Sequence, residues 1–145
     1  MPIVDRCSGL LEAIAVRDMS AKTVADILWS RWITRFGVPE KIISDRGPAF
    51  SNILMEEFQK RMGFSLTKIS PYHPRANGGI ERHHRTLHEN LLLYTKKSSS
   101  RDKNLDAFVF FMRNTVRDGE GYSPAYLAFG TELRVPADLL KREIQ

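Results

Sequence analysis

The sequence predicts one layered α/β domain, and its length, its composition and the order of its apolar patterns all favour this fold class. Its 145 residues fit a single domain, since single domains usually contain about 100–200 residues. The 42% of hydrophobic residues are enough to form a core. Apolar runs of strand length come first, and helical patterns follow them or alternate with further short runs. This order is typical of α/β layers rather than of a helical bundle or a barrel.

Strand and helix signals alternate along the first 70 residues. Ser20 is a good helix N-cap, and Gly37 with Pro39 ends the apolar repeat that follows it, of which Phe36 is the last member. Turn-forming residues separate the first two apolar runs. The expected elements are a hairpin of strands 1–4 and 11–16, a helix over 20–36, a strand at 41–44, a helix at 53–62 and a strand at 64–69.

The second half of the chain is expected to be mainly helical. The expected elements are a loop rich in proline and glycine at 71–79, a long helix over 80–96, a polar linker at 96–103, a third long helix over 105–116 and a short helical stretch ending at Phe129. The apolar stripe of the third long helix is expected to lie in the core, and it consists of Phe108, Val109, Phe111 and Met112. Residues 1–135 are expected to form the domain, and residues 136–145 a C-terminal tail.

Basic residues are concentrated in the middle of the chain. Residues 60–117 contain 12 Lys or Arg and 4 Asp or Glu, whereas the other 87 residues contain 10 and 13. A basic block on an otherwise slightly acidic domain indicates a polyanionic partner. The same pattern also fits a solvated basic helix, so charge alone leaves both interpretations open.

Several classes of protein are excluded by composition. No apolar run approaches the ~18 residues needed to cross a bilayer, and the first fifteen residues carry no signal-peptide pattern. The single cysteine, Cys7, excludes an internal disulfide framework and a cysteine-rich zinc module. We therefore expect an intracellular protein of a reducing compartment, nuclear or cytoplasmic, with no membrane partner.

Two acidic residues stand where carboxylates commonly hold metal ions. Asp45 directly follows an apolar strand, and Glu81 lies in the first turn of the long helix. Hard oxygen donors from two rigid elements suit Mg²⁺, which uses few carboxylates and fills its octahedron with water and phosphate. Taken alone, each residue is better explained as a turn Asp or as a Glu that favours a helix N-terminus.

The spacing and the surroundings of these two residues resemble a known family. Thirty-five residues separate Asp45 from Glu81, as in the D-(35)-E half of the retroviral-type integrase core. SDRGPAF at 44–50 resembles the family's S-D-x-G-x-x-F segment, and YHPRANGGIER at 72–82 resembles Y-H-P-x-x-N-G-x-x-E-R. Further landmarks are FGVP at 36–39, GYSP at 121–124 and FG at 129–130. The similarity covers nearly the whole chain and is closest to integrases in the Pol polyproteins of gypsy-type LTR retrotransposons.

This resemblance implies an RNase H-like polynucleotidyl transferase fold, in which a mixed sheet is flanked by helices. In the family three carboxylates hold two divalent ions, Mg²⁺ or Mn²⁺, which activate a nucleophile for attack on a phosphodiester. Water attacks in 3′-end processing, and the freed 3′-hydroxyl attacks target DNA in strand transfer. By position, Asp45 and Glu81 are the second and third ligands. The implied partners are DNA, at the element ends and in the target, and further copies of the chain in a homodimer or higher oligomer.

The first catalytic Asp of the family has no counterpart in the chain. Residues 1–8 match the family's second strand, so the resemblance implies a domain that is incomplete at its N-terminus, without its opening central strand. Asp5 matches a non-catalytic family position and is expected to be a turn or surface carboxylate rather than a ligand. The chain is therefore expected to be impaired in catalysis. The alternative is a domesticated or degenerate module that binds nucleic acid or protein without being an enzyme.

Residues around Glu81 are expected to contact DNA. Arg85 and His88 lie four and seven residues after Glu81 and share its helical face, which the resemblance orients towards DNA. Arg82 in the motif, and Arg75 and Asn77 in the preceding loop, are further candidates. Arg85 could instead form a simple helix ion pair with Glu81. The four histidines lack the spacing of a zinc site, so we expect no zinc.

Overall fold

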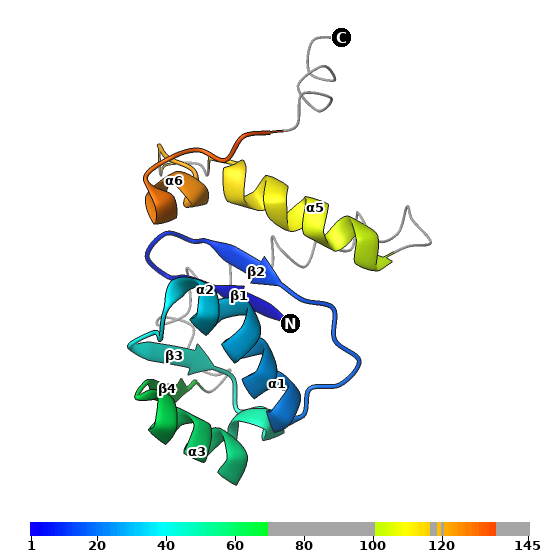
Figure 1. The fold of residues 1–145 in the computed structure, drawn as a ribbon, viewed down its shortest axis with the longest axis vertical. Coiled ribbons are helices and arrows are strands. Elements are labelled where there is room, and N and C mark those ends of the chain that lie inside the picture. Colours follow the sequence, from blue (N-terminus) through cyan, green and yellow to red (C-terminus); the bar gives the residue numbers. More distant parts are fainter. Residues whose placement is uncertain (70–100, 117–118, 120, 136–145) are drawn as a thin grey trace. The chain divides into compact units, whose positions relative to one another are not determined.

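The computed structural model describes residues 1–69, 101–116, 119 and 121–135, drawn in colour in Figure 1. The chain divides into two compact units, one of Met1–Ile14 with His88–Gln145 and one of Ala15–Leu87. Of the expected elements, the loop at 71–79 and the long helix over 80–96 lie outside the described residues. Within the described ranges, no helix is both long enough and apolar enough to cross a membrane.

The first unit begins with the predicted hairpin, which the structure confirms. Strands β1 (Pro2–Val4) and β2 (Leu11–Ala13) pair antiparallel, with Pro2 opposite Ala13. The bonds between Met1 and Ile14 continue this pairing by one residue. The predicted second strand, which extended to Val16, is too long, since β2 ends at Ala13.

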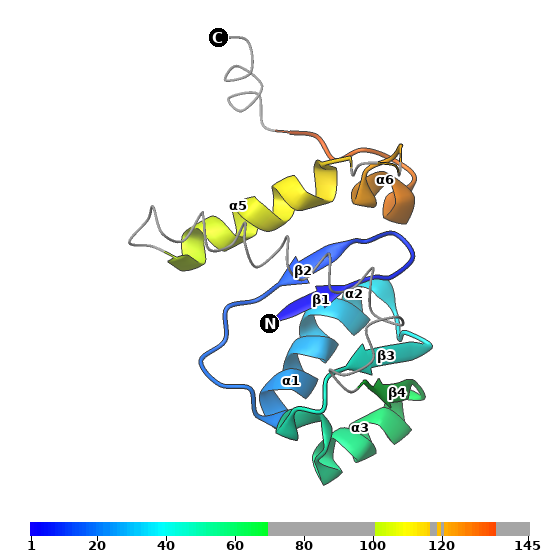
Figure 2. The same ribbon diagram turned by 180° about the vertical axis from the view of Figure 1, so that it is seen from behind.

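Helix α5 (Arg101–Asn114) packs against β2 and contacts α6 (Pro124–Phe129), as Figures 1 and 2 show. Its start corrects the predicted linker, since residues 101–103 belong to the helix. Arg and Lys are good helix formers, so a polar run without Gly or Pro does not by itself mark a break. The short helix α6 is confirmed, with Ser123 as its N-cap and Gly130 at its end.

The predicted core stripe of α5 is correct only in part. Phe108 and Val109 are 3% and 5% exposed, but Phe111 is 38% exposed. Successive residues of an α-helix are turned by about 100°, which places Phe108, Val109 and Met112 on one face of the helix. Phe111 lies outside this face. The exposed ring of Phe111 packs edge-on against Phe110 instead, with centroids 6.3 Å apart.

A buried ion pair attaches α5 to β2. Arg113 Nη2 lies 2.5 Å from Glu12 Oε1, and Arg113 Nε donates a hydrogen bond of 2.8 Å to the Leu11 carbonyl. Glu12 is only 6% exposed. Burying two charges is costly unless they are paired and hydrogen-bonded, so each of these residues requires the other. No local sequence pattern marks Glu12 or Arg113 as members of an ion pair.

The second unit contains the helix predicted over 20–36. The structure confirms that this segment is helical, but its middle part is π-helical rather than α-helical. Helix α1 (Ala21–Ile27) continues into the π-helical segment η1 (Leu28–Ile33) and then into α2 (Thr34–Phe36). The Thr34 amide bonds to the Trp29 carbonyl, five residues back. Gly37 ends the helix at φ 88°, a conformation that favours glycine. Phe36, expected on the apolar face, is 39% exposed and lies against the Trp32 ring.

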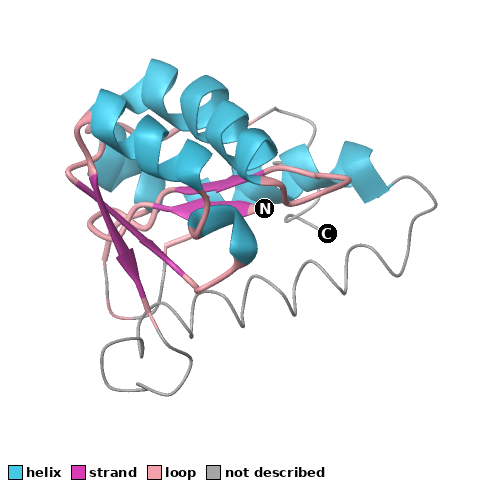
Figure 3. Ribbon diagram, turned by 90° about the horizontal axis from the view of Figure 1, so that it is seen from below, coloured by secondary structure: helices cyan, strands magenta, loops and turns pink. Residues whose placement is uncertain are grey.

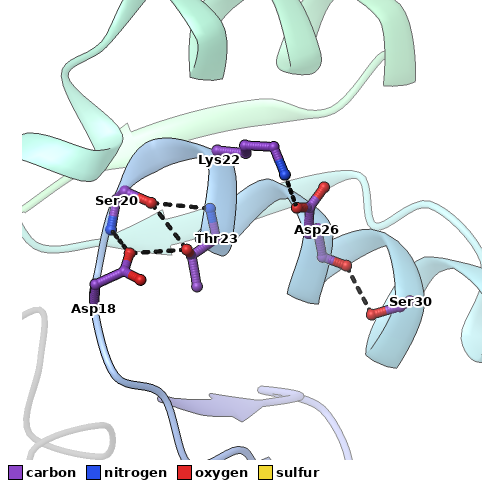
Figure 4. A network of polar contacts seen from close by, with 6 residues as sticks. All are labelled: Asp18, Ser20, Lys22, Thr23, Asp26 and Ser30. Atoms are coloured by element: carbon purple, nitrogen blue, oxygen red, sulfur yellow. Dashed lines mark hydrogen bonds and ion pairs between the residues drawn. The ribbon is translucent and has the colours of Figure 1, made fainter.

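Figure 4 shows the polar network that starts this helix. Ser20 is the predicted N-cap: its hydroxyl accepts a hydrogen bond of 3.2 Å from the Thr23 amide. Asp18 accepts hydrogen bonds from the Ser20 amide and the Thr23 hydroxyl. These bonds hold the pKa of Asp18 below its usual value. One turn later, Lys22 and Asp26 form an exposed ion pair of 2.9 Å.

A predicted strand–helix–strand segment ends the described part of the second unit and is confirmed, with the strand predicted at 64–69 observed over Ser65–Lys68. Strands β3 (Lys41–Ser44) and β4 (Ser65–Lys68) pair in parallel, and α3 (Ile53–Met62) connects them after the 3₁₀ turn η2 (Pro48–Phe50) (Figure 3). Helix α3 packs against α1, where Met55 and Val24 are almost wholly buried. The described strands therefore form one antiparallel and one parallel pair.

We predict that Arg113→Met lowers the free energy of unfolding by about 3–5 kcal/mol, because Glu12 stays buried without its counter-charge. Replacing Glu12 by Leu in the same variant should recover much of this loss. Urea unfolding followed by circular dichroism measures both effects. Lys22→Met, which removes the exposed pair with Asp26, is the control and should leave the unfolding midpoint unchanged. An equal loss of unfolding free energy in Arg113→Met and Lys22→Met would show that burial of the ion pair does not matter for stability.

Candidate functional site

Asp45 directly follows the last residue of β3, at the edge of the sheet where both parallel strands end. Ser44 is in register with Lys68, and the Ile69 amide donates a hydrogen bond of 2.9 Å to the Ser44 carbonyl. Asp45 is therefore the first residue of this segment outside the ladder, and it is exposed. The carboxyl ends of parallel strands are where open α/β sheets commonly bind ligands. The prediction that Asp45 follows a strand is confirmed.

A tight turn orients the Asp45 carboxylate. Its Oδ1 accepts a hydrogen bond of 2.9 Å from the Gly47 amide, which is the pattern of an Asx turn. The Gly47 carbonyl in turn accepts a bond of 3.0 Å from the Phe50 amide, across η2. Ala49 in this turn is only 6% exposed, so the loop is anchored in the core. The carboxylate thus has a defined orientation although it faces solvent.

The charge of Asp45 is not neutralised within the described part of the chain. No ion pair joins Asp45 to another described residue, and of its two carboxylate oxygens only Oδ1 accepts a hydrogen bond from a described residue. The Ser44 hydroxyl donates to the backbone carbonyl of Asp45 and leaves the carboxylate charge unpaired in the described part of the chain. Arg46 and Lys68, the nearest basic residues in sequence and register, are both exposed. An exposed carboxylate with one oxygen held in place is able to bind a cation.

A hard divalent cation fits this donor chemistry, although the described residues do not make a complete site. Mg²⁺ prefers carboxylate oxygens and retains several waters, so one or two protein carboxylates are enough to hold it. Residues 1–69, 101–116, 119 and 121–135 contain no group of three or more His, Cys, Asp or Glu arranged to hold a metal. Asp45 would supply one ligand, and any other must come from elsewhere.

The remaining site residues predicted from the sequence lie outside the described residues. They are the proposed ligand Glu81 and the proposed DNA contacts Arg75, Asn77, Arg82, Arg85 and His88. The structure therefore places Asp45 alone among the predicted site residues. That Asp45 and Glu81 converge on one cation stays a prediction.

Asp5 has the turn role that the sequence favoured over a ligand role. Its Oδ2 accepts hydrogen bonds from the Ser8 amide at 2.8 Å and the Ser8 hydroxyl at 2.6 Å, in the loop between β1 and β2. Partial burial raises the pKa of Asp5, but these hydrogen bonds lower it by more, so the pKa lies below its usual value. The Asp5 carboxylate therefore closes the loop between β1 and β2.

The sequence reasoning missed the contribution of Gly47. In the sequence Gly47 is expected only as part of the SDRGPAF motif, whereas in the structure its amide also holds the Asp45 carboxylate. The signal was present, because an Asp followed two residues later by Gly is a frequent Asx-turn pattern.

We predict different effects on stability for two changes at Asp45. Asp45→Asn keeps an oxygen that can accept the Gly47 amide, so the free energy of unfolding should change by less than about 0.5 kcal/mol. Asp45→Ala removes the acceptor and should cost about 0.5–1.5 kcal/mol, the usual net contribution of one hydrogen bond. Urea unfolding in metal-free buffer distinguishes the two. Equal midpoints for both variants would show that the turn bond does not stabilise the loop.

Comparison with known proteins gives one family and one fold. Residues 1–74 match the family model described as "Integrase core domain". The chain is 33% identical over 129 residues to the "Pol polyprotein" of Radiation murine leukemia virus (strain Kaplan), covering 88% of the chain and 22% of that protein. It is 29% identical over 127 residues to the "Retrovirus-related Pol polyprotein from transposon 412" of Drosophila melanogaster, covering 87% and 10%. The chain thus spans about a fifth or less of these relatives.

Solved structures of integrases share the fold. The catalytic core domain of BIV integrase aligns with a TM-score of 0.73 at 24% identity, over 99% of this chain and 88% of that one. A simian T-cell lymphotropic virus intasome, solved in complex with PP2A regulatory subunit B56 gamma, aligns with a TM-score of 0.77 at 22% identity, over 93% and 49%. These likenesses confirm the fold class that the resemblance predicted.

Proposed function

The chain belongs to the integrase core domain family, and we propose that it acts on DNA as the core of a metal-dependent polynucleotidyl transferase. The reactions would be 3′-end processing and strand transfer, which together integrate DNA. The position of Asp45 carries this proposal: an exposed, oriented carboxylate stands at the carboxyl end of a parallel strand, within a matching family motif. The family match and the Pol polyprotein relatives support it.

Asp45 and Glu81 would hold Mg²⁺ or Mn²⁺ in this role. Two ions about 3.5–4 Å apart, when bound, stabilise both the attacking and the leaving oxygens of an in-line displacement. The contribution of the chain is to present carboxylate oxygens from rigid elements. Asp45 does so from the end of β3, with its Oδ1 bonded to the Gly47 amide. Glu81 would do so from the first turn of the helix predicted from Ile80.

DNA would be held by basic and polar side chains near Glu81. The proposed contacts are Arg75, Asn77, Arg82, Arg85 and His88. The excess of positive charge over residues 60–117 supports this proposal, because contacts of Lys and Arg with phosphates supply most of the sequence-independent affinity for DNA. A homodimer or higher oligomer is also proposed. This part of the proposal rests on the family resemblance.

The number of the family's catalytic carboxylates that have counterparts in this chain determines how much catalysis we expect from it. The family uses three, and two of them, Asp45 and Glu81, have counterparts in its 145 residues. We therefore propose weak or no catalysis by this chain alone. A second candidate function is a degenerate or domesticated module that binds nucleic acid without transferring strands, and the basic block over residues 60–117 supports it.

We predict that the chain alone shows little Mg²⁺- or Mn²⁺-dependent strand transfer on short DNA duplexes, and that Glu81→Gln abolishes what remains. The substitution keeps the shape of the side chain and removes the charge that would hold the metal, so the affinity for DNA should stay within about twofold, as expected for a site away from the phosphate contacts. Product formation on sequencing gels and fluorescence anisotropy measure the two quantities. Robust strand transfer by the unmodified chain would overturn the proposal of weak catalysis, and unchanged activity in Glu81→Gln would overturn the role of Glu81.

We predict that Arg85→Ala weakens binding to duplex DNA similarly for all sequences and lowers the slope of log K against log salt by about 0.9, the value for one lost phosphate contact. Fluorescence anisotropy between about 50 and 200 mM salt measures the slope, since affinity changes strongly over that range. Lys22→Ala, a change at an exposed residue outside the basic block, is the matched control. An unchanged slope in Arg85→Ala would favour the alternative, an ion pair between Arg85 and Glu81.

A further inference from the structure

We propose that Gly47 is a positioning residue for Asp45: because position 47 has no side chain, the Asp45 carboxylate can occupy the orientation in which it binds a metal ion. This inference rests on the proposed function of Asp45 as a metal ligand. It concerns a residue that would touch neither the metal nor the DNA and would act only through its neighbour.

The contact between the two residues is close. The Gly47 amide donates to Asp45 Oδ1 at 2.9 Å. A Cβ atom built on Gly47 would lie 2.9 Å from the same Oδ1 and 3.7 Å from Asp45 Cγ. A carbon and an oxygen that are not bonded do not approach that closely, because optimal contacts lie near 3.5–4.0 Å. Any side chain at position 47 would therefore clash with Asp45 Oδ1 in its observed position.

The backbone does not require glycine at this position. Gly47 has φ −57° and ψ 151°, an extended conformation that every L-residue adopts. The proline that follows favours the same conformation. Gly63 in the same unit is different: it has φ 82°, and a Cβ there would meet no atom within 4 Å. Gly63 thus provides conformational freedom, whereas Gly47 provides space.

The carboxylate, rather than the loop, would move when a side chain is added. The turn is anchored by buried Ala49 and by the bond from the Phe50 amide to the Gly47 carbonyl. Asp45 Oδ1 is the end of an exposed side chain that can rotate. Binding constellations must be held to within about 0.5 Å, so a displacement of this oxygen weakens metal binding while the fold persists.

Mn²⁺ titration of the whole chain, followed by paramagnetic broadening of its backbone amide resonances, tests the inference with four variants. They are Gly47→Ala, Asp45→Ala, the double variant and Gly63→Ala, each also measured for its thermal unfolding midpoint. We expect Gly47→Ala to weaken Mn²⁺ binding about tenfold or more, as is typical when an outer partner of a ligand is changed. Its unfolding midpoint should fall by no more than that of Asp45→Ala, since displacing Oδ1 costs at most the one hydrogen bond of the turn. The double variant should bind as weakly as Asp45→Ala, since Gly47 acts through Asp45.

Gly63→Ala is the matched control and should show the reverse pattern: a lower unfolding midpoint from its strained backbone and unchanged Mn²⁺ affinity. If Asp45→Ala does not weaken Mn²⁺ binding, the proposed function of Asp45 fails and the inference fails with it. If Asp45→Ala weakens binding and Gly47→Ala does not, only the inference fails. A double variant weaker than Asp45→Ala, or a Gly47→Ala variant destabilised by more than Asp45→Ala, would also overturn the inference, because Gly47 would then act on more than the carboxylate.

Discussion

The parallel pairing of β3 with β4 is the constraint on which the candidate site depends. Its last register pair is Ser44 with Lys68, and the Ile69 amide still bonds to the Ser44 carbonyl. Asp45, the next residue, lies just outside the ladder, so only the residues before it are held by backbone hydrogen bonds to β4. Helix α3, which connects the two strands, packs against α1 and buries Met55. Core contacts away from Asp45 therefore fix the end of the strand from which its carboxylate projects.

The charged groups of the two units fall into distinct energetic classes. Glu12 is buried and pairs with the partly buried Arg113, because an isolated buried charge costs several kcal/mol. Asp5 is partly buried and is satisfied by the Ser8 amide and hydroxyl. Asp45 is exposed and has a single amide partner among the described residues. A carboxylate that contributes little to folding but is held in one orientation is suited to binding a cation.

The sequence predicts elements best where turn chemistry bounds them. The strand at 41–44 and the helix at 53–62 match to the residue, because Asn52 caps the helix and Gly63 ends it. The start of α5 was placed late because polar residues resemble a linker. The ion pair of Glu12 and Arg113 joins residues about a hundred positions apart, which no local pattern encodes. For the site, the motif identifies Asp45 and its strand, but a spacing along the chain does not establish that Asp45 and Glu81 are close in space.

The π-helical segment η1 changes how positions along its helix correspond to those of a relative. Bonds to the fifth residue back, such as that from the Thr34 amide to the Trp29 carbonyl, accommodate about one more residue than an α-helix of the same rise. Residues 34–36 are thereby turned by about 100° from the direction that an uninterrupted α-helix would give them. A homologue with an uninterrupted α-helix would orient the residues that follow in the same way with one residue fewer in the segment that corresponds to 28–33. An alignment of this segment should therefore admit a single-residue gap within 28–33, and the surface around Trp29 should be compared by orientation rather than by residue count.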